Sequence, residues 1–209
     1  MTNKKQNTIE VVRDVKQGEL ESAYAVGAFD KAKDAIENDG YRVISLQENA
    51  RLRMQEGADS SVSQRGNWTR EGVLYVPKKG IYLVRDSPIL DNAEEATNYH
   101  RNSKEFYLTN EQVEKSLVDS VKFKGSEIPT NSFAENPITA FAFGKYAKAY
   151  GEFLKEAEID SIETYAASTG NKPFARQMWL LRLNDVDRSD LGGGSRILNC
   201  GEVRGVREK

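Results

Sequence analysis

The residues most often used for catalysis and metal binding are scarce in this sequence. It has one histidine, His100, and one cysteine, Cys200. A histidine-activated nucleophile would need His100 as its base, and the pair cannot form a zinc site of the usual nitrogen and sulfur type. We interpret His100 as a cation at a helix end and Cys200 as a small buried side chain. The sequence therefore predicts no zinc, no internal disulfide and no cofactor.

Two loops contain residues of the kinds that bind phosphate or calcium. Three consecutive glycines, residues 192–194, precede a predicted strand, whereas phosphate loops open a helix. Residues 185–190 have carboxylates at alternate positions, as calcium loops do. However, Asp190 stands where that pattern needs glycine, and Arg196 stands where it needs glutamate. We interpret the first loop as a flexible connection and the second as a solvated turn.

Residues 64–85 have an excess of cationic side chains. The cations are Arg65, Arg70, Lys78, Lys79 and Arg85, and the only acid is Glu71. Arginines on a loop beside an exposed Trp68 could contact phosphates and stack on a base. The alternative is a solvated hairpin with Trp68 packed under the loop. We expect ligand or partner binding through residues 60–85, with nucleic acid as one candidate, although the formal net charge of -2 gives no general attraction to it.

A different function is indicated by three residues far apart in the chain. Arg85 ends a predicted strand, Ser132 ends the run Thr130-Asn131-Ser132 before a predicted helix, and Glu202 follows a late predicted strand. In this order they resemble the mono-ADP-ribosyltransferases. The resemblance implies an NAD-dependent transferase with Arg85, Ser132 and Glu202 as catalytic residues. The sequence departs from the family where Ser-Thr-Ser is expected, and Cys200 stands two residues before Glu202 in place of Glu or Gln.

Several helices are predicted from capping signals and periodicity. Capping-box pairs, Ser45 with Glu48 and Thr109 with Gln112, begin two helices. Further helices are expected at residues 19–38, where Ala, Leu, Glu and Lys dominate, and at 91–102. Asn136 followed by proline opens the longest helix, whose apolar stripe makes it the centre of the core. That stripe contains Phe143, Ala147, Tyr150 and Leu154.

The clearest strands flank a proline and glycine turn. Residues 73–76 and 81–84 predict a hairpin around 77–80. Shorter strands are expected at residues 41–46, 105–108 and 196–199. Residues 173–183 fit either a helix or a buried strand, with length and the leading proline slightly favouring helix.

Composition and length place these elements in one domain. The chain has 209 residues, with 38% hydrophobic and 30% charged side chains, which is a globular composition. We expect an α+β fold with a single core, in which a small, mainly antiparallel sheet built on hairpin 73–85 is packed by several helices. Residues 1–12 form a flexible arm and 13–209 the domain. No signal peptide or membrane span is apparent, which favours a soluble cytoplasmic protein; its partners are unknown and a homo-oligomer stays open.

Overall fold

The computed structural model describes residues 9–16, 18–183, 189–194 and 198–208. Its strands are β1 Val11–Val15, β2 Leu20–Gly27, β3 Arg42–Val43, β4 Asn67–Val76, β5 Gly80–Val84, β6 Phe106–Tyr107, β7 Ser120–Lys122, β8 Ser126–Pro129, β9 Ser161–Tyr165, β10 Phe174–Leu180, β11 Leu191–Gly192 and β12 Gly201–Glu208. Its α-helices are α1 Phe29–Asn38, α2 Leu46–Glu56, α3 Ala93–Arg101, α4 Asn110–Leu117, α5 Pro137–Phe143 and α6 Ala147–Glu156. Short 3-10 helices span Leu90–Asn92, Thr130–Ser132 and Gly144–Tyr146.

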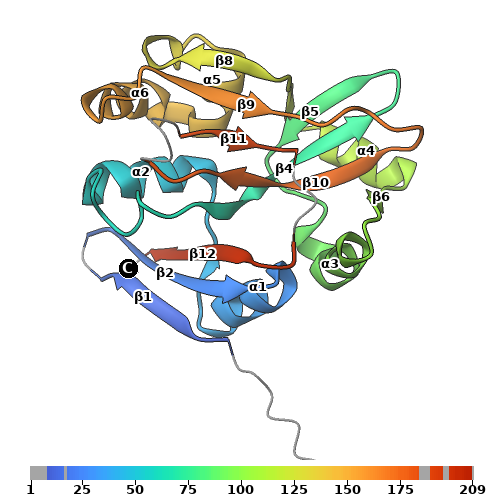
Figure 1. Cartoon of the computed structure of the whole chain (residues 1–209), viewed down its shortest axis with the longest axis horizontal. Helices are drawn as coiled ribbons and strands as arrows, with labels where there is room; N and C mark the ends of the chain where they lie inside the picture. Colours follow the sequence, from blue (N-terminus) through green and yellow to red (C-terminus); the bar gives the residue numbers. More distant parts are fainter. Residues whose placement is uncertain (1–8, 17, 184–188, 195–197, 209) are drawn as a thin grey trace, which may run out of the picture.

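One large mixed sheet joins the twelve strands of the described residues (Figure 1). Its main order is β1-β2-β12-β4-β10-β11-β9-β8, and β3, β5, β6 and β7 pair at its sides. Most pairs are antiparallel, but β12 is parallel to β4 and β11 is parallel to β9. The predicted small hairpin sheet is therefore wrong. The hairpin is present, but distant strands extend it because β12 inserts between β2 and β4.

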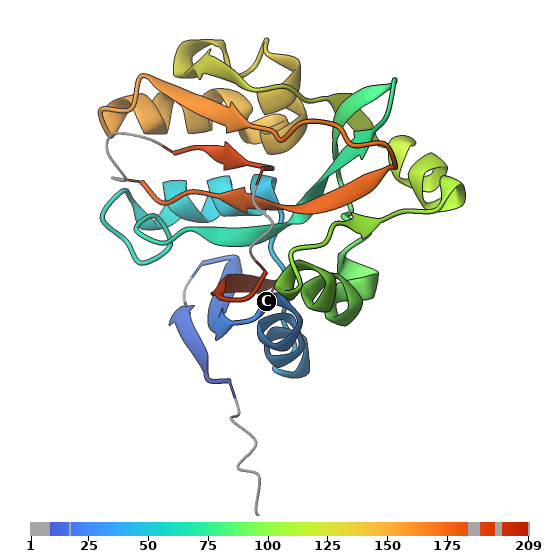
Figure 2. The ribbon, with the colours of Figure 1, turned by 45° about the vertical axis from the view of Figure 1, so that its right-hand side comes forward.

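The two faces of the sheet each carry their own hydrophobic cluster. On one face, Val73 and Tyr75 of β4 pack with α2, α5 and α6. On the other, Leu74 and Val76 pack with α1, α3 and α4, and Figure 2 shows α1 and α3 side by side. A third, smaller cluster lies between β1, β2, α2 and β12. The predicted single core is therefore replaced by clusters that a central sheet separates.

Strands replace part of one predicted helix and settle one segment that fitted either a helix or a strand. Residues 20–27 form β2, which pairs with β1 and along all eight residues with β12, and only the second half of 19–38 is helical. Residues 174–180 form β10, a strand buried on both faces that pairs with β4, β6 and β11. In both cases tertiary pairing outweighs local propensity.

The local signals are confirmed where they depend on neighbouring residues. Both capping boxes form, at Ser45 and at Thr109. The hairpin pairs residues 72–76 with 80–84. Asn136 caps α5 as predicted, but the expected long helix is interrupted at Gly144, whose φ of 53° is favoured only by glycine. Phe143, Tyr150 and Leu154 are buried in the core as predicted.

Near the two ends of the chain, the structure differs from the predicted arm 1–12 and the predicted strand 196–199. Val11 and Val12, expected in the polar arm 1–12, belong to β1, and residues 1–8 of that arm lie outside the described residues. The predicted strand 196–199 lies partly outside them as well, and the last strand begins at Gly201. Within the described part of the chain, no helix is long and apolar enough to cross a membrane.

Candidate functional site

The sheet divides at Arg70, in the first half of β4. Before this residue β4 lies beside β12, and after it β4 pairs with β5. At the division the amide of Arg70 donates to the carbonyl of Ile44 at 2.8 Å, and its carbonyl accepts from the amide of Ser87 at 3.0 Å. We call this division the sheet fork.

A cavity of about 730 Å³ lies at the sheet fork, and we call it the fork cavity. It is bounded by α1, β3, β4, α4 and the segment after β5. Its volume is in the range of small-molecule sites. Its lining contains the cationic side chains Lys33, Arg42, Arg70, Arg85 and Lys115 and the carboxylates Glu37, Asp86, Asp91 and Asp119. A cavity with this lining can offer charged hydrogen bonds to a polar ligand.

The arginines of the fork cavity have partners that a ligand could replace. Arg70 pairs with Asp86, and both side chains are largely exposed. The Nε of Arg85 lies 3.6 Å from Asp119, and its guanidinium lies 3.9 Å above the ring of Phe141. Ion pairs this exposed contribute little to stability. Exchange of their carboxylates for a ligand anion is therefore inexpensive.

Lys115 and Asp91 differ from the other charges of the fork cavity. Within the described residues neither forms an ion pair. Lys115 is exposed on α4, and among the described residues no side chain pairs with its ammonium group. Of the cations that line the cavity, Lys115 can therefore bind an anion without breaking an existing ion pair.

Glu71 lies next to Arg70 on β4 and points to the opposite face, because side chains alternate along a strand. Its side chain is buried, and both carboxylate oxygens accept the amide N–H of Leu46, at 3.1 and 2.9 Å. Burial raises the pKa of Glu71 to about 7, and the Leu46 amide and the Arg85 guanidinium offset part of that rise. The sheet fork thus contains a carboxyl group that changes charge near neutral pH.

A second group of charges lies where β12 passes β1 and β2. Arg204 is fully buried and donates to Asp14 at 2.8 Å, to Ser22 at 2.8 Å and to Glu202 at 3.0 Å. Glu202 also accepts from Arg65 at 3.2 Å. None of these residues lines the fork cavity as described. Because every charge in the group has a partner, we interpret it as structural.

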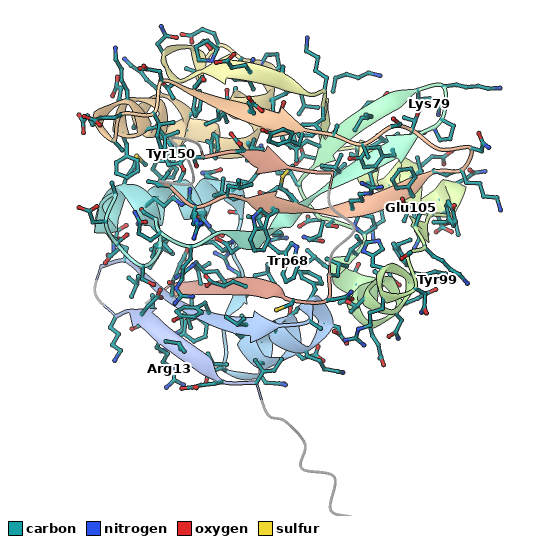
Figure 3. All side chains as sticks on the ribbon, viewed as in Figure 1. Arg13, Trp68, Lys79, Tyr99, Glu105 and Tyr150 are labelled. Atoms are coloured by element: carbon teal, nitrogen blue, oxygen red, sulfur yellow. The ribbon has the colours of Figure 1, made fainter. Side chains whose placement is uncertain are left out.

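The predicted basic surface is divided among three places. Arg70 lines the fork cavity, and Arg65 is engaged with Glu202. Lys78 and Lys79 are at the tip of the β4–β5 hairpin, far from Trp68 in the middle of the molecule (Figure 3). Trp68 is only 3% exposed and packs edge-on against Phe29 and Trp179. It is buried between α1 and β10, so it does not present an exposed face for stacking.

The three residues suggested by the transferase resemblance have separate surroundings. Arg85 lines the fork cavity. Ser132 lies on a 3-10 helix and donates to the carbonyl of Pro129 at 2.8 Å. Glu202 lies on β12 between Arg65 and Arg204. Each therefore makes its contacts with a different part of the chain.

The remaining candidate residues have mainly structural surroundings. His100 is in the last turn of α3, as predicted, and is buried, whereas Cys200 is exposed and not buried as expected. A Cβ on Gly193 would lie 2.5 Å from Cγ2 of Val73, so the glycine run packs closely on β4 and is no loose connection. Most of the acidic loop 185–190 lies outside the described residues.

In the part of the chain that the structure describes, no group of three or more His, Cys, Asp or Glu side chains could hold a metal ion.

Sequence reasoning found Arg70 and Arg85 but missed their neighbours. Lys115, Asp91 and Asp119 lie on or beside helices, and nothing in their local pattern separates them from solvated surface charges. Glu71 offered one signal, because it is an acid two residues before the apolar run 73–76 of a predicted strand. The pairing of β4 with elements on both sides of the fork is what brings these residues together.

Comparison with known proteins informs the fold alone. No protein-family model matches the chain, and no curated protein matches it. The chain is similar to a solved structure described as "Accommodation of massive sequence variation in Nanoarchaeota by the C-type lectin fold", with a TM-score of 0.69 and 14% sequence identity. The match covers 93% of this chain and 100% of that chain. The large mixed sheet is therefore similar to the C-type lectin fold, which replaces the predicted fold and by itself assigns no function.

Proposed function

We propose that this chain is a binding protein whose fork cavity takes a small polar ligand that carries an anionic group. The observation that carries the proposal is the convergence of Arg70, Arg85 and Lys115 on one cavity of ligand size. Two of these three cations belong to the basic segment identified in the sequence. The guanidinium groups offer planar, paired donors that suit carboxylate, sulfate or phosphate.

The lining also limits the kind of ligand. No aromatic side chain is among the described residues that line the fork cavity, so a nucleobase would find no ring on which to stack. Trp68, the one aromatic expected to serve that purpose, is buried. A compact anion with further polar groups, which the carboxylates and Gln112 can bind, fits better than an oligonucleotide.

The test is a binding screen with matched variants. Thermal shift and calorimetry would be measured with sulfate, small dicarboxylates, a sugar phosphate and a short oligonucleotide. We expect a compact anion to bind the wild type. Arg70→Ala should weaken that binding about tenfold or more, because a hydrogen bond to a charged group is worth about 1.5–3 kcal/mol. Lys115→Ala should weaken it less, because the lysine contributes a single point charge.

The control variant is Lys79→Ala, at the exposed hairpin tip outside the fork cavity. It removes the same charge as Lys115→Ala, and it should leave compact-anion binding unchanged. The proposal fails if none of the compact anions binds, or if Lys79→Ala weakens binding as much as Lys115→Ala. Binding of only the oligonucleotide, lost in Lys79→Ala, would favour the basic hairpin instead.

A further inference from the structure

Arg85 belongs to two environments at the sheet fork. It lines the fork cavity, where its Nε lies 3.6 Å from Asp119. The β4–β5 pairing matches Gly72 with Val84, so Arg85 and Glu71 follow next to each other at the end of this antiparallel pair, and the guanidinium charge acts on the buried Glu71 carboxyl group. An anion that attracts Arg85 in the cavity therefore changes the electrostatic surroundings of a group that the anion does not touch.

In the described part of the chain, Arg85 is the charged group that acts on the Glu71 carboxyl group. The neighbours of the carboxyl are neutral: the Leu46 amide at the start of α2 and the Thr69 hydroxyl on β4. The segment α5 has no charged residue. Other charged side chains of α2 and β10 are engaged elsewhere, in the contacts Arg42–Glu48, Glu19–Arg51, Arg53–Tyr150 and Glu105–Arg176.

The backbone also connects Glu71 to the walls of the cavity. Leu46, whose amide holds the Glu71 carboxyl group, follows β3 by three residues, and β3 contributes Arg42 and Val43 to the cavity lining. Arg70 and Glu71 are adjacent on one strand and face opposite sides of it. The Glu71 carboxyl group is thus connected through the backbone to two segments that line the cavity, β3 and β4.

We propose that Glu71 couples anion binding in the fork cavity to proton uptake, and that the charge of Arg85, which acts on both the anion and the Glu71 carboxyl group, transmits the coupling. The inference rests on the proposed function. When a doubly charged anion such as sulfate replaces Asp119 beside Arg85, it offsets more of the Arg85 charge than the single carboxylate did. Ionised Glu71 is then less favoured, and the carboxyl group takes up a proton. By linkage, protonation of Glu71 must then strengthen anion binding by the same factor. Anions should bind more tightly below neutral pH than above it.

The experiment measures sulfate affinity at about pH 6 and about pH 8 at constant ionic strength. Sulfate is chosen because it keeps its charge over this range. We expect three- to tenfold tighter binding to the wild type at the lower pH, tenfold corresponding to a shift of one pKa unit. Glu71→Gln keeps an oxygen that can accept from Leu46 but cannot titrate, so its sulfate affinity should be independent of pH. Glu152→Gln, an exposed glutamate on α6, should behave like the wild type.

A second measurement needs no variant. Calorimetry of sulfate binding near pH 7, repeated in buffers of different ionisation enthalpy, should show net proton uptake by the wild type. The coupling is overturned if sulfate binds with no proton uptake and equal affinity at both pH values, or if Glu71→Gln keeps the full pH dependence. In both of those outcomes the fork cavity remains an anion site. Failure of sulfate and of every other compact anion to bind at either pH would instead overturn the proposed function together with the coupling.

Discussion

Glu71 and Glu202 are both buried carboxylates, but their charges are compensated differently. Glu202 lies between two guanidinium groups, those of Arg65 and Arg204. Burial raises its pKa, and Arg204 and Arg65 offset part of that rise. Glu71 has a backbone amide as its hydrogen-bond donor, and among the described residues it forms no ion pair; only the charge of Arg85 acts on it. Its ionisation is therefore the costlier of the two for the fold.

The stability of the protein should depend on pH through Glu71. The pKa of this carboxyl is about 7 in the folded chain against a usual 4.5. Between these values the folded state keeps a proton that the unfolded state has lost, so the free energy of unfolding falls as pH rises from about 4.5 to about 7. At about pH 8 and above the cost is complete, on the order of 3 kcal/mol.

Urea unfolding of the wild type and Glu71→Gln at about pH 5 and about pH 8 checks this expectation. The variant should be the more stable protein at the higher pH, and its advantage should shrink at the lower pH. Glu202 contributes a slope of the same sign, so the variant should keep part of the pH dependence. An identical pH dependence in the two proteins would mean that Glu71 does not titrate in this window.

At the scale of single elements, the N-terminus of α2 is stabilised by a complete capping box. Ser45 accepts from the amide of Glu48 at 3.2 Å, and the Glu48 carboxylate accepts from the amide of Ser45 at 3.0 Å. The next residue, Leu46, holds Glu71. The start of α2 therefore connects a local motif to the sheet fork.

Ser45→Ala should lower the free energy of unfolding by about 1 kcal/mol, because it leaves the first turn of α2 without its side-chain acceptor. The matched control is Ser116→Ala in the last turn of α4, where the serine has no side-chain hydrogen bond among the described residues. Chemical denaturation of both variants measures the difference. Equal losses would show that the capping box contributes nothing of its own.

At the scale of the whole molecule, β12 holds the ends of the fold together. It lies between β2 and β4 in the sheet. Arg204 on this strand reaches Asp14 on β1 and Ser22 on β2, the latter 182 residues away in the chain. In Figure 1 the strand from the C-terminal end lies among those from the N-terminal end. Contacts between the last strand and the first two strands thus hold this end of the sheet together.

Arg204→Leu should destabilise the protein by about 3–5 kcal/mol, because it leaves Glu202 and Asp14 without their buried partner. Arg207→Leu is the control on the same strand. Its ion pair with Glu21 at 2.6 Å is partly exposed, and its loss should cost less than about 1 kcal/mol. Equilibrium unfolding of both variants gives the comparison, and similar losses would contradict a buried network that joins the termini.

The sequence by itself determined the features that depend on residues a few positions apart. Both capping boxes, the Asn136 cap and the 77–80 turn form as predicted. The scarcity of histidine and cysteine, which is a property of the sequence alone, also limits the chemistry open to the chain. A cap needs only the amide two or three residues ahead, and a hairpin needs only the strand that follows its turn, so the local pattern contains the whole interaction.

Only the tertiary structure decided the sheet and the site within it. Residues 20–27 have helix-forming composition, yet they form a strand because β12 pairs with all eight of them. Arg70 and Arg85 were identified in the sequence for two different functions, and Lys115 was not identified at all. They share a cavity because β4 pairs with β12 before the fork and with β5 after it. Partners this distant lie outside any local window, and the free energy that selects them comes from burying both faces of the completed sheet.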